Sequence, residues 1–255
     1  MGVIIKNLNG CVAVVTGVSH GKGIGAAICK KLAIEGADIF FTHLNADRDW
    51  IANFQASIEE HKVKCANVEI DLSESSTPAK LLDLVNLKLG SPTILVNNAA
   101  HSTRDGYMNL DAKILDDHYA VNMRATFLLS VEFARRIRHS QTAMGRIINL
   151  TSGQALGPMA GELAYSATKG AISAFTLSLS AELAPLGITV NAVNPGPTDT
   201  GWMNEEIKQE LLPKFPFGRI GIPEDAARLV AFLASEEAQW ITGQIFNSEG
   251  GFLRS

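Results

Sequence analysis

A tyrosine and a lysine stand four residues apart in the segment YSATK, and a serine precedes the tyrosine by thirteen residues. Tyr165 and Lys169 would lie on one face of a helix, because residues four apart are neighbours on an α-helix. An ammonium beside a phenol lowers the pKa of the phenol toward neutral pH. Tyr165 could then exchange a proton with a substrate oxygen to which Ser152 donates a hydrogen bond. Tyr–Lys pairs also occur by chance on helix surfaces, so this chemistry depends on the elements around it.

The segment TGVSHGKGIG, residues 16–25, has two possible nucleotide-binding spacings. Gly17, Gly21 and Gly23 give G-x3-G-x-G, whereas Gly17, Gly23 and Gly25 give G-x5-G-x-G. Apolar residues repeat every four positions from Ile24, which places Gly23 and Gly25 in the first turn of a helix and favours the longer spacing. Glycines there would let a pyrophosphate reach the N–H groups at a helix N-terminus. The alternative is a glycine-rich turn without a ligand.

Strand patterns and helix patterns alternate along the chain, which is typical of a parallel sheet covered by helices. We therefore predict an α/β fold: a single doubly wound Rossmann-type domain over residues 1–255, with about seven strands and helices on both faces. The irregular residues 196–221 are predicted to form a lid over a substrate. Strands are expected at 12–16, 37–43, 64–71, 93–98, 145–152, 188–195 and 243–248, and helices at 23–36, 47–61, 76–90, 163–186, 223–235 and twice within 110–139.

Composition narrows the classes of protein that are possible. The 255 residues are 46% apolar and carry a formal net charge of -4, which gives no overall attraction to nucleic acid or to an anionic membrane surface. No apolar run approaches the ~20 residues of a membrane span, and the first ten residues are too polar for a signal peptide. Cys11, Cys29 and Cys65 lack metal-ligand spacing and are interpreted as reduced packing residues. We expect a cytoplasmic protein without a metal site.

Ordered motifs along nearly the whole chain resemble the short-chain dehydrogenase/reductase family. They are the glycine loop after Thr16, DL at 71–72, NNAA at 97–100, VNM around Asn122, Ser152, YSATK, NPGPTDT at 194–200 and ITGQIFNSEGG near the C-terminus. The likeness is greatest to the 3-oxoacyl-carrier-protein reductase-like group, and it extends over the segment GRIGIPEDAARLVAFLAS. Members commonly form dimers or tetramers, so the resemblance implies a homo-oligomer, with a homotetramer as the working expectation.

The resemblance implies a role for each of four residues. Ser152 would orient and polarise a substrate carbonyl, and Tyr165 would be the general acid in reduction and the base in oxidation. Lys169 would hold the nicotinamide ribose hydroxyls and lower the pKa of Tyr165. Asn122 would hold a water that links Lys169 to solvent. A polar residue satisfied within its helix is the alternative interpretation of Asn122.

The resemblance also implies a set of cofactor-binding residues. Asp71 would accept a hydrogen bond from the adenine amino group, although it could merely cap a loop. The backbone of residues 98–100 would lie along the cofactor, and Thr200, with the main chain near Thr198, would hold the nicotinamide carboxamide. The full set is Gly17, Ser19, Lys22, Gly23, Ile24, Gly25, His43, Asp71, Leu72, Asn98, Ala99, Ala100, Tyr165, Lys169, Pro195, Gly196, Thr198 and Thr200.

Two departures from the family pattern bear on function. Ala100 stands where the family usually has glycine, which would tighten the backbone beside the cofactor. The longer glycine spacing looks like that of a divergent branch of enoyl reductases. Those enzymes have six intervening residues between the catalytic tyrosine and lysine. That spacing would lead from Tyr165 to Ile172, which cannot replace the lysine. The catalytic helix therefore follows the carbonyl-reductase pattern.

The end of the second predicted strand bears on the choice of nicotinamide cofactor. An acidic residue there usually bonds the ribose 2′-OH of NAD, but this strand ends in Thr42 and His43. Lys22 matches a basic residue that many NADP-dependent relatives carry, and His43 or Arg48 could help it to bind a 2′-phosphate. Lys22 could equally be an ordinary solvated lysine. NADP(H) is favoured over NAD(H).

These features predict an NADP(H)-dependent oxidoreductase that reduces a carbonyl to a secondary alcohol, the substrate being a ketone or a 3-oxoacyl thioester. Trp202, Met203, Leu211, Phe215 and Phe217, with Leu212, give the lid apolar residues that suit a hydrophobic substrate or close the lid against the body. The alternatives are an NAD(H)-dependent alcohol or sugar dehydrogenase of the same family and a nucleotide-sensing protein without turnover. Because the residues of the catalytic set are all present, an enzyme is favoured.

Overall fold

The computed structural model describes residues 8–139 and 144–254. Within these residues, seven strands form one sheet in the order β3-β2-β1-β4-β5-β6-β7, and every neighbouring pair is parallel. This is the strand order of a doubly wound dinucleotide-binding sheet. It confirms the predicted fold class. The strands are β1 (Val12–Val15), β2 (Asp38–His43), β3 (Cys65–Glu69), β4 (Ile94–Asn97), β5 (Gly145–Leu150), β6 (Ile188–Asn194) and β7 (Ile245–Asn247).

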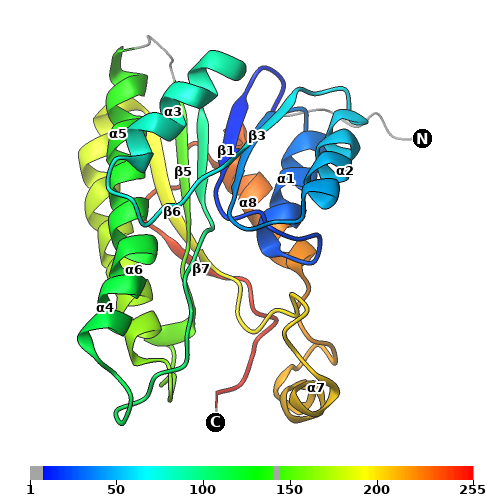
Figure 1. Ribbon diagram of the computed structural model, residues 1–255, viewed down its shortest axis with the longest axis vertical. Coiled ribbons are helices and arrows are strands. Elements are labelled where there is room, and N and C mark those ends of the chain that lie inside the picture. The colour runs from blue at the N-terminus through cyan, green and yellow to red at the C-terminus, as the bar shows by residue number, and fades with distance from the viewer. Residues whose placement is uncertain (1–7, 140–143, 255) are drawn as a thin grey trace.

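Helices cover both faces of the sheet (Figure 1). One face carries α1 (Ile24–Ile34), α2 (Arg48–Glu59) and α8 (Pro223–Ala234), and the other carries α3 (Thr77–Lys88), α4 (Ala112–His118), α5 (Thr126–His139) and α6 (Leu163–Leu183). Successive strand residues point to opposite faces, so Phe41 packs into the first layer and Phe40 into the second. All three cysteines are free thiols, and Cys29 and Cys65 are buried, as expected of packing residues.

Two helical regions differ from the prediction. The helix expected to reach residue 186 ends at Leu183 and continues as a short 3-10 turn, Ala184–Leu186, because Pro185 has no N–H to donate. The stretch 196–221, which was expected to be irregular, contains α7 (Glu205–Leu211). The side chain of Asn204 accepts the Ile207 N–H at 2.9 Å and starts this helix.

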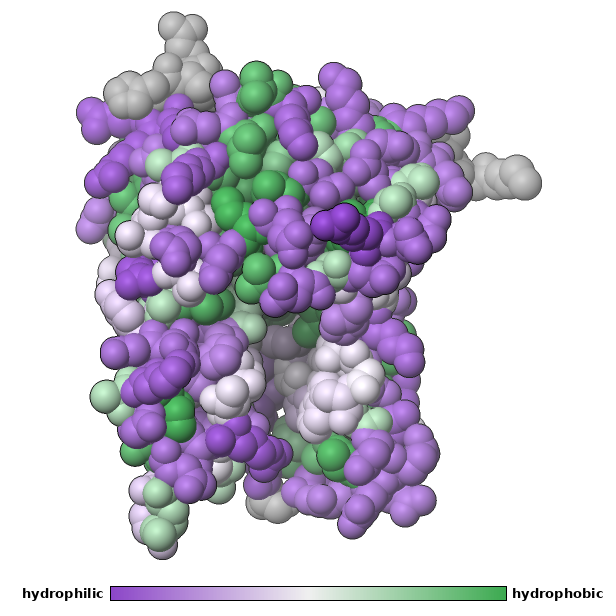
Figure 2. All heavy atoms as spheres, in the orientation of Figure 1, coloured by the Kyte–Doolittle hydropathy of each residue, from purple (hydrophilic) through white to green (hydrophobic). Residues whose placement is uncertain are grey.

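The fold brings the carboxyl ends of the strands to one edge of the sheet, where a doubly wound protein binds its ligands. The order of the strands reverses between β1 and β4, so the loops that follow these two strands flank a crevice. Figure 2 shows the surface hollowed in the lower half of the molecule, between the part that carries α4 and the part that carries α7. Among the helices of the described residues, none is both long and apolar enough to traverse a bilayer.

Candidate active site

The glycine loop has the geometry that the longer spacing predicts. Gly23 is the N-cap of α1, and Gly21 lies in the loop before it. A Cβ added to Gly25 would lie 2.6 Å from Asn98 Nδ2 and 3.0 Å from the Gly17 oxygen, so this position in the first turn tolerates only glycine. Gly17 has a φ of +73°, which also favours glycine. The residues at the start of α1, Gly23, Ile24 and Gly25, line a cavity, and the ring of His20 lies beside Gly23.

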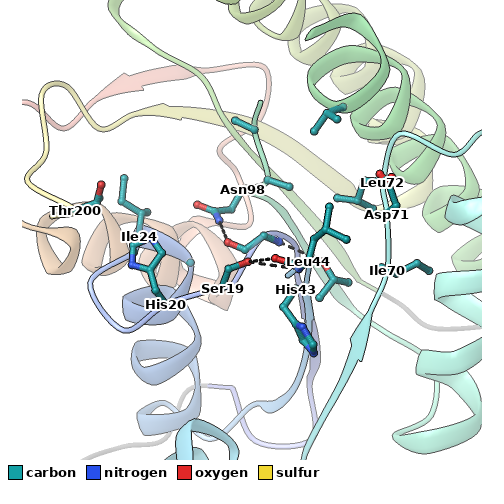
Figure 3. A pocket seen from close by; sticks show the side chains of 17 residues that line it. Ser19, His20, Ile24, His43, Leu44, Ile70, Asp71, Leu72, Asn98 and Thr200 are labelled. Carbon is teal, nitrogen blue, oxygen red and sulfur yellow. Dashed lines mark hydrogen bonds between the residues drawn. The ribbon is translucent and has the colours of Figure 1, made fainter. Parts of the chain in front are cut away.

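This first cavity, of about 410 Å³, lies beside the glycine loop at the carboxyl ends of β1, β2 and β4. Figure 3 shows it from close by, with Thr200 and Ile24 at one end and Asp71 and Leu72 at the other. We call it the nucleotide cavity. Of the predicted cofactor-binding residues, it is lined by Gly17, Ser19, Gly23, Ile24, Gly25, His43, Asp71, Leu72, Asn98, Ala99, Ala100 and Thr200. The residues His20, Thr42, Leu44, Ile70 and Val121 also line it and were not predicted.

Two of the lining residues are partly engaged in holding loops. The Asn98 amide donates to the oxygens of Thr16 and Gly17, at 2.8 and 3.0 Å, and so fixes the glycine loop against β4. The Asp71 carboxylate accepts the Ser73 N–H at 2.8 Å, which is the loop-capping role that the sequence left open. Asp71 nevertheless lines the cavity, so capping the loop and facing a ligand are compatible here.

The structure corrects the expectation for Lys22. Lys22 does not line the nucleotide cavity. Its Cδ lies 3.3 Å from the position of a Cβ on Gly201, and its charge helps to hold the pKa of Asp199 below the usual value, after the Gly201 N–H and the Lys208 ammonium. Lys22 therefore lies beside the segment that follows β6. The position of the residue in the motif does not reveal this contact.

His43 ends β2 and contributes to the cavity wall, but its ring is held on the other side. The ring is near Phe41, at 6.2 Å between centroids, and its Nε2 lies 3.2 Å from Asn67 Oδ1. In Figure 3 the ring points away from Asn98 and Asp71. Arg48, the first residue of α2, does not line the cavity.

A second cavity, of about 770 Å³, contains the predicted catalytic serine and tyrosine. We call it the substrate cavity. It shares Ile24 and Thr200 with the nucleotide cavity, so the two adjoin. Ser152 follows β5, and its hydroxyl lies close enough to that of Tyr165, near the start of α6, to favour the phenolate, while it donates to Met159 Sδ at 3.7 Å. The Nζ atom of Lys169 lies 5.4 Å from the centre of the Tyr165 ring. The structure thus brings together the three residues that the sequence proposed.

The electrostatics of this group differ from the sequence expectation, which was a lowered pKa for Tyr165. Burial raises the pKa of Tyr165 to about 12; the charge of Glu162 adds to this effect, and the nearby Ser152 hydroxyl opposes it. Burial also lowers the pKa of Lys169 to about 8. The Lys169 ammonium donates to the Leu150 oxygen at 2.8 Å. In this structure, burial is therefore the main cause of both shifts.

Asn122 lies in a π-helical segment, Tyr119–Ala125, between α4 and α5. Its side chain is fully buried: Oδ1 accepts the His101 N–H at 2.7 Å, and Nδ2 donates to the His101 oxygen and to Thr168 Oγ1, at 2.9 and 3.0 Å. The Asn122 side chain thus ties the loop after β4 to the helix that carries Lys169. A π-helical turn inside an α-helix is frequent at functional sites.

The segment after β6 closes the junction of the two cavities. Pro195, Gly196, Thr198 and Thr200 all line the substrate cavity. The Thr198 hydroxyl donates to the oxygens of Pro195 and Gly196, at 3.1 and 3.2 Å, which holds the segment in a tight turn. Two adjoining cavities, one beside a helix N-terminus and the other containing a serine and a tyrosine, fit a dinucleotide whose reactive ring meets a substrate at the junction.

The apolar residues of the predicted lid divide between the two roles considered from the sequence, contact with a substrate and packing against the body of the protein. Trp202 and Leu211 line the substrate cavity. Met203 and Phe215 are buried and close the lid against the body, whereas Phe217 is 80% exposed and does neither.

Three residues of the site were missed by the sequence analysis. Arg104, after β4, and Arg254, after β7, line the substrate cavity. The buried carboxylate of Asp105 accepts the N–H groups of Leu163 and Ala164, both at 2.8 Å, and so caps α6. These residues lie far along the chain from Ser152 and Tyr165, and no local pattern marks them. The arginines could have been considered only after the fold had placed their segments at the same edge of the sheet.

Comparisons with known proteins agree with this geometry. Residues 17–253 match the family model described as "Enoyl-(Acyl carrier protein) reductase". The chain is 63% identical to an uncharacterized oxidoreductase, YjdA, of Bacillus subtilis, over 95% of this chain and 97% of that one. It is 37% identical to the 3-oxoacyl-[acyl-carrier-protein] reductase FabG of Aquifex aeolicus, over 96% and 98%. A solved short-chain dehydrogenase/reductase from Serratia marcescens is 36% identical, with a TM-score of 0.87 over 96% of this chain and 99% of that one. The chain therefore belongs to the short-chain dehydrogenase/reductase family, whose members are oxidoreductases that use NAD(H) or NADP(H).

Proposed function

We propose that this enzyme reduces a carbonyl to a secondary alcohol with NADPH. The observation that carries the proposal is that Ser152 and Tyr165 line one cavity, which adjoins the nucleotide cavity. A carbonyl oxygen placed between these two hydroxyls would accept hydrogen bonds from both. Its carbon would then face the junction that Ile24 and Thr200 share.

The chain's own residues supply orientation and a proton, while the nicotinamide, when bound, supplies hydride. Ser152 polarises the carbonyl, and Tyr165 transfers its phenolic proton to the oxygen as negative charge develops there. A pKa of about 12 keeps Tyr165 protonated at neutral pH, as a proton donor must be. Lys169 faces the Tyr165 ring and would hold the ribose hydroxyls. Asn122 would hold the water that returns a proton to this group.

Residues beside the nucleotide cavity would hold the rest of the dinucleotide. The N–H groups at Gly23 and the start of α1 would bind the pyrophosphate, and Asp71 with Leu72 would enclose the adenine. The backbone of residues 98–100 would lie along the cofactor. Thr200 and the main chain near Thr198 would hold the carboxamide at the junction.

Carbonyl reduction is preferred over enoyl reduction because of the spacing on α6. Lys169 lies one turn from Tyr165, with its ammonium 5.4 Å from the ring centre. The position seven residues after Tyr165 is Ile172, which is buried and cannot act as a base or a cation. The name of FabG, a 3-oxoacyl reductase, is consistent with a ketone substrate.

The preference for NADPH rests on the end of β2. Thr42, His43 and Leu44 line the nucleotide cavity there, and none is acidic. The Glu69 carboxylate accepts the Asn45 N–H at 3.1 Å and does not line the cavity. A 2′-phosphate would therefore meet no carboxylate at this wall, and Ser19 and His20 offer polar groups to it. Lys22 no longer supports this preference.

The test follows NADPH oxidation with a panel of ketones, aldehydes and acetoacetyl thioesters, for wild type and for Tyr165→Phe. We expect turnover of at least one carbonyl by wild type and its loss in the variant, with NADPH binding retained. If wild type and variant bound NADPH equally and were equally inert, the enzyme would not be a carbonyl reductase.

The dimer or tetramer expected from the family stays a prediction, which light scattering can check.

A further inference from the structure

The substrate cavity is lined by three cations from three separate segments. Arg104 follows β4, Lys214 follows α7, and Arg254 follows β7. Glu162 is the single acidic residue among the described residues that line this cavity. The three segments are far apart in the sequence, so these cations meet only in the folded chain.

The three cations differ in how their charge is compensated. Arg254 forms a two-pronged ion pair with Glu249, at 2.8 and 2.6 Å. The Arg104 side chain is 79% exposed and reaches Glu162 only at 4.0 Å. Lys214 is half-buried, and the described residues provide neither an ion-pair nor a hydrogen-bond partner for its ammonium. The charge of Lys214 is therefore uncompensated at the cavity wall.

Arg254 brings its charge close to the reacting groups. Its Nη2 atom would lie 2.3 Å from a Cβ on Gly153, the residue next to Ser152, so the guanidinium lies directly against this part of the loop. Glu249 fixes the orientation of the guanidinium by binding Nη1 and Nη2. A guanidinium carries five N–H donors, and among the described residues Nε–H and one N–H of Nη2 have no hydrogen-bond acceptor.

We propose that the natural substrate carries an anionic group, a carboxylate or a phosphate, beside its reducible carbonyl, and that Lys214 binds this group. This inference rests on the proposed carbonyl reduction. A bound anion would form a charge-assisted hydrogen bond with the free ammonium, and Arg254 would add to the positive potential beside Ser152. Met159, Trp202 and Phe252 would cover the short carbon chain between the two groups.

The test compares anionic ketones with their neutral analogues. One pair is 4-oxopentanoate and its methyl ester, and the other is dihydroxyacetone phosphate and dihydroxyacetone. The variant is Lys214→Met, and the matched control is Lys208→Met. Lys208 belongs to α7 in the same lid, but it is paired with Asp199 and Glu205, both at 3.2 Å, and does not line the cavity.

For wild type we expect kcat/KM to favour the anionic member of at least one pair by about tenfold, the effect of one charge-assisted hydrogen bond. Lys214→Met should abolish this preference, and Lys208→Met should keep it. The pair of compounds that shows the preference identifies the anionic group of the substrate as a carboxylate or as a phosphate. A wild-type preference for the neutral members, or an equal loss on both members in Lys214→Met, would overturn the inference.

Calorimetry on the NADP⁺-saturated protein, with the same four compounds, separates this inference from the proposed function. Suppose that no carbonyl were reduced, but that the anions bound more tightly than the neutral compounds in wild type and not in Lys214→Met. Only the proposed reaction would then fail. If carbonyls were reduced while anions bound no more tightly than their neutral partners, only the anion site would fail.

Discussion

The ammonium of Lys169 donates a hydrogen bond to the backbone oxygen of Leu150, at 2.8 Å, in the interior of the protein. Burial lowers the pKa of this lysine from 10.5 to about 8. The protonated lysine therefore destabilises the folded state at neutral pH while pointing toward the ring of Tyr165. Retaining a buried cation at this cost is reasonable if the charge serves the reaction, and the cost can be measured.

Lys169→Met should be more stable than wild type at pH 7. The difference between the two pKa values corresponds to about 3 kcal/mol, from which the lost hydrogen bond to Leu150 subtracts. Between pH 8 and 10.5 the unfolded lysine holds its proton and the folded one has lost it, so this lysine makes the free energy of unfolding rise with pH in wild type alone. The buried thiols of Cys29 and Cys65, whose pKa values burial raises, act in the opposite direction in both proteins. Urea titrations across this range should therefore show the stability difference between variant and wild type shrinking as the pH rises. A parallel profile for both proteins would contradict it.

The high pKa of Tyr165 predicts a difference between the two directions of the reaction. Reduction uses the protonated phenol, which is abundant at neutral pH because burial raises the pKa to about 12. Oxidation uses the phenolate, whose fraction rises about tenfold for each pH unit below the pKa. Initial rates at subsaturating alcohol should therefore increase steeply from pH 7 to pH 9, whereas ketone reduction should not. Rates of alcohol oxidation that stay constant over this range would show that another group is the base.

Coenzyme choice should respond to a carboxylate at the end of β2. Leu44 lines the nucleotide cavity and is exposed, so Leu44→Asp places an acceptor where a ribose 2′-OH would bind and a 2′-phosphate would be repelled. We expect the ratio of kcat/KM for NADPH to that for NADH to fall by about tenfold or more. Glu69→Gln is the control, because this carboxylate does not line the cavity and its removal should leave the ratio unchanged. A wild-type preference of tenfold for NADH would reverse the assignment of the coenzyme.

The sequence predicts those parts of the site that depend on local pattern. The glycine register follows from the four-residue repeat after Gly23, and the pairing of Tyr165 with Lys169 follows from helical spacing. The position of Lys22 beside Gly201 could not be predicted, because these two residues are far apart in the sequence and meet only in the folded chain. Arg254 could not be found because its place beside Gly153 results from the closure of the whole sheet. The raised pKa of Tyr165 was missed because burial is a property of the packed protein.

We predict that Asp105 positions the helix that carries Tyr165. Its carboxylate accepts the N–H groups of Leu163 and Ala164, and Tyr165 is the next residue along α6. Burial alone would raise the pKa of Asp105, but these N–H groups, with that of Gly106, outweigh burial and hold the pKa below its usual value. The carboxylate is therefore ionised at neutral pH and complements the positive N-terminal end of the α6 dipole.

Asp105→Ala should lower kcat by about tenfold or more, since a displacement of Tyr165 by a fraction of an ångström disturbs proton transfer. The KM for NADPH should change little, because Asp105 does not line the nucleotide cavity. Asp47→Ala is the matched control: Asp47 caps α2 by accepting the Trp50 N–H at 2.7 Å, on the opposite face of the sheet. Each variant should lose about 1–2 kcal/mol of stability, the usual cost of a lost cap. The assays are run well below the melting temperatures of both variants. An equal loss of kcat in the two variants would mean that Asp105 acts on stability alone. A loss of kcat in Asp105→Ala only, with partial recovery in Asp105→Asn, places the effect of Asp105 at Tyr165.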